Sequence, residues 1–455
     1  MLSGALELPD DSHLRPLLER LRPEAVLRAC RDQFSRIHRG PPPDWRCCRM
    51  IESLYHPGRY VRAAFVLLSD DSIPPNRAWP QGEIVYLHGP LRAPVSRRGG
   101  VLDLNGRNVE AYRFPNDRRL RGLRKFTGRS AAATAWQHWI DSGSDAFDLD
   151  AGSLRRVLIR YVPEQKWIIR LRARGTEYAN GCPSKRSIAV RCTSAWVCGE
   201  LERRHRLFDR VLERGDSGLS VPGVVGVHLE GGLLATEWIR GKTLVETLAR
   251  EPADRVLRNV ARSLTAFHSL PIRTRDTMSL PDIDRRIRDA ALDLSCALPE
   301  RRREVEHIGR TLRRVLSGLD APADATLHND LHWNQLRLGG DRTVFLDLER
   351  VCVGDPLIDV ANLATQLRML ADRPAVGVRR EDATRWADEF LEAWSRETDR
   401  RIDPRRFRCY AALSRLELAR GMLRHLRPGW RDLAERCITL ADTDVASTSG
   451  KVVVA

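Results

Sequence analysis

Short apolar runs separated by turn residues predict a small antiparallel sheet in the middle of the chain. Residues 157–161 and 166–171 flank the sequence Val-Pro-Glu-Gln and predict a hairpin, and residues 187–192 predict a third strand. Residues 197–212 carry apolar side chains at helical spacing, which is typical of a helix packed on a sheet. Residues 233–244 predict a further strand that ends at a glycine and opens a helix. The pattern in this part of the chain therefore predicts a sheet of strands with one helix packed on it.

Longer amphipathic patterns dominate the rest of the chain towards the C-terminus. They predict helices over residues 256–270, 301–319, 381–394 and 405–426. One hairpin interrupts them, because the apolar runs 335–338 and 343–348 flank the turn signal Gly339-Gly-Asp341. A β-rich part followed by a mainly helical part predicts the α+β fold class.

The first 130 residues lie outside this arrangement and predict an additional N-terminal α/β domain. Residues 60–68 and 83–87 are strand candidates. Tyr55-His-Pro-Gly-Arg59, with the apolar run after it, is similar to Tyr161-Val-Pro-Glu-Gln165 and the run that follows. Two hairpins with similar turns fit a duplicated sheet, and they fit coincidence equally well. The Ser-, Ala- and Gly-rich residues 131–152 predict a linker.

Composition and charge narrow the class of protein. The chain has 455 residues, of which 42% are hydrophobic, and this is enough for two or three domains with their own cores. The formal net charge is +16, a value that often accompanies nucleic-acid binding. Here the arginines are spread among acids rather than gathered in one tract, so nucleic-acid binding is not favoured.

The sequence indicates neither secretion nor membrane insertion. The first eleven residues contain acids where a secretory signal needs bases, and no apolar run approaches the length of a membrane span. The 10 cysteines include no Cys-x-x-Cys pair, so neither a zinc site nor a disulfide framework is indicated. We therefore predict a cytoplasmic protein with reduced thiols and no membrane partner.

Two aspartates beside the predicted C-terminal hairpin are the main candidates for chemistry. Asp330 lies on the loop that enters the hairpin, and Asp347 lies near the end of its second strand. Because a hairpin brings its ends together, the two carboxylates can face one small volume. Phosphoryl transfer from a nucleotide needs a group that positions the attacking hydroxyl and a carboxylate that holds magnesium on the phosphates. Asp330 can do the first and Asp347 the second.

The segment around these aspartates resembles the aminoglycoside phosphotransferase family, the kinase-like enzymes that phosphorylate small-molecule hydroxyls. The resemblance rests on His328-x-Asp330, on Leu331-His332, on Phe345-Leu-Asp347 and on Gly354-Asp-Pro-x-x-Asp359. It implies a two-lobed protein-kinase-like fold with a small β-rich lobe and a large mainly helical lobe. It also implies ATP and Mg²⁺ as cofactors. Asp330 would orient the hydroxyl and accept its proton, and His328 would orient the loop by hydrogen bonding.

Two positions depart from the family's pattern. The family has an asparagine five residues after the catalytic aspartate, where this chain has Gln335; either Gln335 or Asn334 would join Asp347 at the metal. The family has a lysine on the third strand of the small lobe, where this chain has Arg191. An arginine can hold phosphate oxygens through its two-pronged guanidinium. Glu200, on the following helix, is its predicted partner.

The resemblance further implies a hinge between the lobes and several backbone anchors. Backbone groups near Glu237, Trp238 and Ile239 would hydrogen-bond the adenine ring. Val162-Pro-Glu-Gln165 replaces the Gly-rich loop of protein kinases, which favours the small-molecule branch. Asp355 and Asp359 are predicted to anchor backbone, with Asp359 as the cap of a helix.

Together these features predict the domains and the function. The domains are an additional domain, a linker, a small nucleotide-binding lobe, a large catalytic lobe and a tail, at residues 1–130, 131–152, 153–240, 241–445 and 446–455. The predicted function is transfer of the γ-phosphate of ATP to a hydroxyl of a small molecule: an antibiotic, a sugar or a biosynthetic intermediate. The alternative is a catalytically weakened kinase-like protein that binds nucleotide or a partner. The sequence indicates no oligomeric state.

Overall fold

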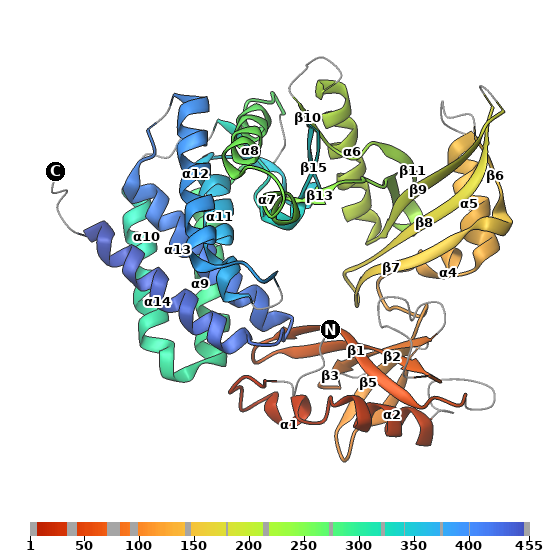
Figure 1. The fold of residues 1–455 in the computed structure, drawn as a ribbon. Helices are drawn as coiled ribbons and strands as arrows, with labels where there is room; N and C mark the ends of the chain where they lie inside the picture. The colour runs from red at the N-terminus through yellow and green to blue at the C-terminus, as the bar shows by residue number, and fades with distance from the viewer. Residues whose placement is uncertain are drawn as a thin grey trace. The chain divides into compact units, whose positions relative to one another are not determined.

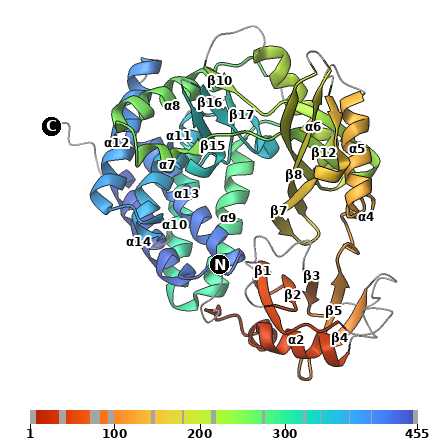
Figure 2. The same cartoon turned by 45° about the vertical axis from the view of Figure 1, so that its right-hand side comes forward.

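The protein folds into two compact units, seen in a computed structural model (Figures 1 and 2). The first unit comprises Met1–Arg203, Gly223–Trp238 and Arg424–Pro428, and the second comprises Arg204–Pro222, Ile239–Leu423 and Gly429–Ala455. The structure describes residues 7–33, 43–70, 82–91, 99–141, 147–178, 181–212, 218–272, 276–319, 324–340, 342–373, 376–399 and 401–449. We describe each unit by itself.

The first unit begins with an antiparallel sheet of five strands in the order β1-β2-β3-β5-β4. The strands are β1 (Cys47–His56), β2 (Tyr60–Leu68), β3 (Glu83–Gly89), β4 (Gly100–Asp103) and β5 (Asn108–Arg113). The predicted strands 60–68 and 83–87 are both confirmed. Of the short helices α1 (Arg15–Leu18) and α2 (Pro23–Asp32), the second packs against β1 and β4 (Figure 2). The apolar run of β2 is buried on both faces, as a continuous apolar strand requires.

A second antiparallel sheet follows in the same unit. Its strands are β6 (Phe147–Leu149), β7 (Arg155–Val162), β8 (Lys166–Glu177), β9 (Pro183–Cys192), β11 (Val224–His228) and β12 (Leu233–Glu237). The order is β11-β12-β9-β8, and both β6 and β7 pair with β8. Helix α6 (Ala195–Leu212) confirms the helix predicted over residues 197–212. It joins β9 to the later strands. Strand β11 was not predicted.

The two sheets share one strand order. Across the sheet, the order β7-β8-β9-β12-β11 matches the order β1-β2-β3-β5-β4 when the strands of each set are numbered along the chain, and every neighbouring pair in both sets is antiparallel. The first hairpin closes with the pair His56 and Tyr60, and the second with Val162 and Lys166. This common order supports a duplicated sheet over coincidence.

The predicted linker, residues 131–152, is part of the packed core, so this prediction was wrong. The stretch contains most of α5 (Arg129–Asp141), which follows α4 (Leu123–Phe126), together with β6 and the start of the short η1 (Ala151–Ser153). Trp136 and Trp139 of α5 are buried in one core with side chains from both sheets. Alanine is also the strongest helix former, so a composition that suggested a flexible linker was equally compatible with a buried helix. Residues 142–146 lie outside the described residues.

The second unit contains the predicted C-terminal hairpin within a small sheet of order β10-β16-β15-β13. These strands are β10 (Leu219–Ser220), β13 (Lys242–Thr243), β15 (Leu336–Gly339) and β16 (Arg342–Phe345). A separate pair consists of β14 (Ala325–Leu327) and β17 (Cys352–Gly354). Strand β16 ends at Phe345, so Asp347 lies two residues beyond the strand in which it was predicted. Asp341 of the predicted turn lies outside the described residues.

Helices make up most of the second unit. They are α7 (Leu244–Leu248), α8 (Ala253–His268), α9 (Leu280–Ala297), α10 (Arg302–Ser317), α11 (Leu357–Arg368), α12 (Arg380–Thr398), α13 (Pro404–Arg424) and α14 (Trp430–Ser449). The predicted helices 256–270, 301–319, 381–394 and 405–426 correspond to α8, α10, α12 and α13. Helix α8 packs against α12, and α10 packs against both α9 and α14.

Two of these helices were not predicted. Helix α9 begins with a capping box formed by Ser279 and Asp282, a signal that the sequence does contain. Helix α14 runs to Ser449, so the predicted tail at 446–455 begins inside a helix, and residues 450–455 lie outside the described residues. Within the described ranges, no helix is long and apolar enough to cross a membrane.

Candidate active site

A buried aspartate fixes the backbone of the loop that carries Asp330. Asp359, in the first turn of α11, accepts hydrogen bonds from the backbone N–H groups of His328 and Asn329, each at 2.7 Å. His268 Nε2 lies 3.3 Å from the same carboxylate. Asn329 has a positive φ of 60°, a conformation that asparagine tolerates better than most residues. The loop after β14 is therefore held in one conformation from inside the protein.

The prediction that Asp359 caps its helix was wrong. The N-cap of α11 is Pro356, which makes no side-chain capping bond. Asp355 instead accepts the backbone N–H of Leu357 at 3.0 Å and lies 3.5 Å from a guanidinium nitrogen of Arg406. Burial raises the pKa of Asp355, although the bond from Leu357 and the charge of Arg406 oppose the rise. Asp355 thus stabilises the start of the helix, whereas Asp359 stabilises the loop.

His328 joins the loop to the segment before Asp347. Its ring is buried, and Nε2 lies 2.7 Å from the backbone oxygen of Leu346. Hydrogen bonding through this nitrogen is the contact that an orienting role requires, because a ring with Nε2 committed to a carbonyl is held in place.

A partly buried ion pair supports the loop from another side. Arg286 of α9 makes two bonds to the carboxylate of Glu417 on α13, with Nε 2.7 Å from Oε1. A third nitrogen, Nη1, donates to Asn329 Oδ1 at 2.7 Å. The Asn329 side chain in turn donates to the backbone oxygen of Arg350 at 3.3 Å. The residue before Asp330 is therefore fixed through both its backbone and its side chain.

Asp330 itself is presented to solvent. Its side chain is 42% exposed, and Oδ1 lies 3.9 Å from Nη1 of Arg350. The protein atoms packed around the carboxylate raise its pKa, the charges of Arg350 and His328 lower it, and those of Asp347 and Glu417 raise it. Water still reaches the carboxylate, which screens these charges.

The candidate metal ligands surround the start of β15 and the end of β16. Asp347 is half-buried, has a φ of 57° and precedes the short helix η5 (Leu348–Arg350). The backbone oxygen of Gln335 accepts the N–H of Leu346 at 2.8 Å, which places Gln335 opposite the residue before Asp347. Asn334 is exposed, and its N–H donates to His332 Nδ1 at 3.2 Å. Of the two amides, Gln335 is the one whose backbone is paired beside Asp347.

This donor set suits magnesium. In the described part of the chain, no three His, Cys, Asp or Glu side chains group as a metal site. Magnesium needs no such group, because it takes one or two protein carboxylates and completes its shell with phosphate oxygens and water. One carboxylate and one amide oxygen, both hard donors, therefore fit it.

Arg204 holds the segment that follows Asp347. This buried side chain of α6 donates to the backbone oxygens of Leu348 and Glu349, and its Nη2 lies 2.7 Å from Asp276 Oδ2. Sequence reasoning missed Arg204, and also Arg286, Glu417, Arg350 and His268. Helix α6 offers Arg203, Arg204 and Arg206 within four positions, and no pattern in the sequence says which one is buried.

The predicted phosphate-binding residues lie in the first unit. Arg191 is half-buried on β9. Burial and the charge of Glu202 raise the pKa of Cys198 on α6 to about 11, and the charge of Arg191 opposes the rise. Glu200 on the same helix accepts a hydrogen bond from Arg203 at 2.8 Å. Glu202, which also lies near Cys198, is a second acid within this region.

The predicted hinge residues end strand β12. The backbone N–H of Glu237 donates to Gly223 at 2.9 Å, and that of Trp238 donates to Ser187 at 3.3 Å. Arg170 stacks over the Trp238 ring at 4.5 Å. One of the points where the chain passes from the first compact unit to the second lies between Trp238 and Ile239, within the predicted hinge.

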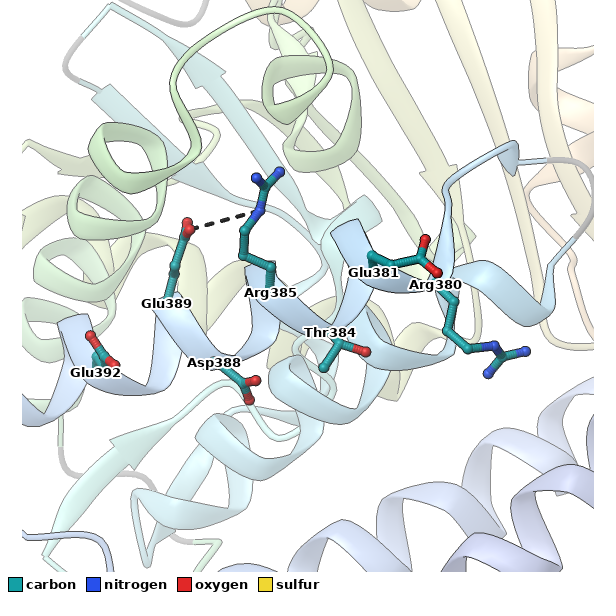
Figure 3. Close-up of a pocket in the computed structure, with 7 residues that line it drawn as sticks. All are labelled: Arg380, Glu381, Thr384, Arg385, Asp388, Glu389 and Glu392. Carbon is teal, nitrogen blue, oxygen red and sulfur yellow. Dashed lines mark ion pairs between the residues drawn. The ribbon is translucent and has the colours of Figure 1, made fainter.

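A surface pocket on α12 contains none of these residues. It is lined by Arg380, Glu381, Thr384, Arg385, Asp388, Glu389 and Glu392 (Figure 3). Its charges pair with one another and with neighbours, as in the pairs Arg385–Glu389 and Arg368–Asp388. Paired charges on an exposed helix face are typical of a solvated surface.

A β-rich first part and a mainly helical second part make up the two-lobed, α+β, protein-kinase-like fold of small-molecule phosphotransferases. The sequence profile of the phosphotransferase enzyme family matches residues 148–437. This match covers more than half of the chain, and the protein belongs to that family, which includes the aminoglycoside phosphotransferases. The N-terminal sheet, residues 47–113, precedes the matched region.

Several solved structures are similar at low identity. A choline kinase from Cryptosporidium parvum Iowa II has 12% identity and a TM-score of 0.47, with 66% of this chain and 91% of that chain covered. A choline/ethanolamine kinase family protein from Mesorhizobium loti has 16% identity and a TM-score of 0.43, with 64% and 92% covered. Aminoglycoside phosphotransferase APH(4)-Ia, in a ternary complex with AMP-PNP and hygromycin B, has 17% identity and a TM-score of 0.43, with 70% and 100% covered. No curated protein matches the sequence.

Proposed function

We propose that the protein transfers the γ-phosphate of ATP, with Mg²⁺, to a hydroxyl group of a small molecule. The observation that carries the proposal is the presentation of Asp330. Asp359, Arg286 and His328 fix the surrounding loop from the interior, yet the Asp330 carboxylate stays accessible to solvent. A rigid loop around one accessible carboxylate is what positioning of an attacking hydroxyl requires.

The reaction needs little covalent help from the protein. The acceptor oxygen forms a bond to the γ-phosphorus, the bond from that phosphorus to the β–γ bridging oxygen breaks, and ADP leaves. Asp330 accepts a hydrogen bond from the acceptor hydroxyl and takes its proton late in the transfer. Arg350, which lies beside Asp330, stabilises the carboxylate in its ionised form before transfer. His328 stays hydrogen-bonded to Leu346 and holds the loop.

The remaining candidate residues bind the cofactors. Asp347 and the amide of Gln335 would hold Mg²⁺, which neutralises charge on the phosphates when bound. Asn334 is the other candidate amide. Arg191, with Glu200 as its partner, would hold phosphate oxygens through its guanidinium. The backbone N–H groups of Glu237 and Trp238 are already used within the sheet, so the donor to adenine would be that of Ile239.

A second candidate function follows from Arg191. An arginine in place of the family's lysine has a larger, forked head group, so it can bind nucleotide in a geometry that does not favour transfer. The protein would then be a kinase-like nucleotide- or partner-binding protein with weakened catalysis. Arg191→Lys separates the two candidates, because it restores the family's residue at this position. If the wild-type protein is fully catalytic, Arg191→Lys should change its turnover by less than about ten-fold, whereas in a weakened protein the substitution should raise turnover by more than that.

The central experiment measures Mg²⁺-dependent ADP release with a panel of hydroxylated small molecules, and in parallel the binding of ATP by thermal shift. Asp330→Asn should lower turnover about 10²–10⁴-fold, because it removes the proton acceptor. ATP binding should change little. Asp254→Asn, an exposed aspartate paired with Arg258 on α8, is the matched control. ATP binding without turnover on any acceptor would support the second candidate, and an Asp330→Asn variant with full turnover would contradict the proposed mechanism.

A further inference from the structure

A buried carboxylate lies at the tip of the β7–β8 hairpin. Glu164 belongs to the turn between Val162 and Lys166, and its side chain has 0% exposure. Its φ is +62°, a backbone conformation for which glycine is the usual residue. A glutamate at a glycine-like position, with its charge removed from water, must be stabilised by specific partners.

Those partners come from the N-terminal sheet and from the segment after it. Glu164 Oε1 lies 3.0 Å from His88 Nδ1, and Oε2 lies 3.2 Å from Arg62 Nη2. Arg118 and Arg119 reach Oε2 at 3.1 and 3.5 Å. His88 and Arg62 are themselves buried.

The backbone of the turn is held as well. Asp117 Oδ2 accepts the N–H of Glu164 at 2.9 Å and the hydroxyl of Tyr161 at 2.8 Å. Burial by itself raises the pKa of Glu164, but the hydrogen bond with His88 and the charges of Arg62, His88 and Arg118 outweigh burial and keep the pKa below its usual range. The carboxylate is therefore ionised at neutral pH, and both the charge and the backbone of the turn are fixed.

The repeated strand order gives this contact a specific meaning. Val61 pairs with Gly89 next to the turn of the first hairpin, and Trp167 pairs with Cys192 next to the turn of the second. The residue before Gly89 in β3 is His88, and the residue before Cys192 in β9 is Arg191. These two residues therefore occupy matching positions in the two sheets. Arg191 is the residue assigned to nucleotide phosphates above. In the N-terminal sheet, the matching position binds the carboxylate of Glu164.

We propose that the N-terminal sheet binds the β7–β8 turn through Glu164 as it would an anionic ligand, and thereby sets how tightly the protein binds nucleotide. This inference rests on the proposed function, because the turn between the first two strands of a kinase-like small lobe lies over the nucleotide phosphates. A turn that is ordered before binding costs no ordering free energy when nucleotide binds. Glu164 is a positioning residue, since it acts through the turn and not on the substrate.

Two measurements on the full chain test the proposal. Hydrogen exchange of the peptide spanning residues 160–168 reports whether the turn is held, and calorimetric titration with Mg²⁺ and AMP-PNP reports nucleotide affinity. Glu164→Gln keeps the size of the side chain and removes its charge. We expect exchange at the turn at least ten-fold faster, a Kd at least ten-fold higher, and a kcat at saturating ATP within three-fold of wild type. Glu177→Gln, which removes a carboxylate paired with Arg186 in the same sheet, should leave all three within two-fold.

Glu164→Asp provides a second variant if Glu164→Gln does not fold. It keeps the charge but withdraws the carboxylate from His88 and Arg62. We therefore expect faster exchange at the turn and a higher Kd for AMP-PNP, as in Glu164→Gln. Unchanged exchange in the folded variant would overturn the proposal, and so would faster exchange with an unchanged Kd. A wild-type protein that binds no AMP-PNP would contradict the proposed function instead, and the exchange measurement would still decide whether the N-terminal sheet holds the turn.

Discussion

Asp359 Oδ1 accepts the backbone N–H of Asn329 at 2.7 Å, across 30 residues of sequence. The other oxygen of the same carboxylate accepts the N–H of His328. One buried side chain of α11 therefore satisfies two consecutive backbone donors of the loop that leads to Asp330. Backbone donors in a buried loop need such acceptors, because an unsatisfied N–H costs more than the bond contributes.

Removing this acceptor should weaken both the fold and the catalytic loop. In Asp359→Ala, two buried N–H groups lose their partner, and we expect the free energy of unfolding to fall by about 2–4 kcal/mol. We also expect turnover to fall more than ten-fold in protein that is still folded, because Asp330 is no longer fixed. Urea denaturation and steady-state kinetics measure the two effects. Asp388→Asn, an exposed residue on α12, is the control. A stable variant with normal turnover would show that the loop needs no anchor.

The pair Arg286 and Glu417 should act as one unit. Their two bonds are partly buried, and Arg286 also contacts Asn329 beside Asp330, the proposed catalytic aspartate. We expect Arg286→Met and Glu417→Gln each to lower stability and turnover, and the double variant to cost less than the sum of the two. The coupling free energy should be about 1–3 kcal/mol, as measured by a double-mutant cycle. Strictly additive effects would mean that the two side chains support the loop independently.

Gln335 and Asn334 are alternative magnesium ligands, and substituting each of them distinguishes the two possibilities. If Gln335 is the ligand, Gln335→Ala should raise the Mg²⁺ concentration for half-maximal turnover about 10–100-fold, the range seen when a metal site loses a supporting group. Asn334→Ala should then leave it within two-fold. The reverse result would assign the metal to Asn334. The prediction favours Gln335, since its backbone pairs with Leu346 next to Asp347.

Glu52 should make the first unit sensitive to acid. It is buried at 3.0 Å from His425, and Arg427 and Arg160 each approach to 3.1 Å. Burial raises its pKa, but the hydrogen bond and charge of His425 and the charges of Arg427 and Arg160 prevail and lower the pKa to about 2 from 4.5. The pKa of Glu52 is lower in the folded state than in the unfolded state, so the ionised side chain stabilises the fold. This stabilisation is fully present above about pH 4.5 and is lost as the pH falls towards 2.

The difference between the pKa of 4.5 in the unfolded chain and about 2 in the folded protein corresponds to about 3 kcal/mol of stability near neutral pH. In Glu52→Gln we therefore expect a free energy of unfolding about 3 kcal/mol below wild type at pH 7, with the gap closing as the pH is lowered from 5 to 2.5. Chemical denaturation at a series of pH values measures the gap. Glu392→Gln, an exposed substitution on α12, should show no gap at any pH. A gap that stays constant with pH would rule out the charge of Glu52 as its cause.

Local pattern was sufficient to predict much of the fold. Strands 60–68, 157–161 and 166–171 and the helix over 197–212 follow from short-range periodicity, because burial of one face imposes the spacing directly on the chain. The linker prediction failed at residues 131–152, where an Ala-rich segment is compatible with either a flexible chain or a buried helix. Only the neighbours of Trp136 and Trp139 decide between them.

The sequence by itself determined the class of chemistry, because Asp330 and Asp347 lie on either side of one hairpin, where short-range spacing fixes geometry. The tertiary structure decided which side chains support that hairpin. Arg286, Glu417 and Arg204 reach it from three helices, and no local pattern marks them. It also showed that the N-terminal sheet shares a core with the next sheet and binds Glu164. Such contacts depend on how distant segments pack, so only the folded chain reveals them.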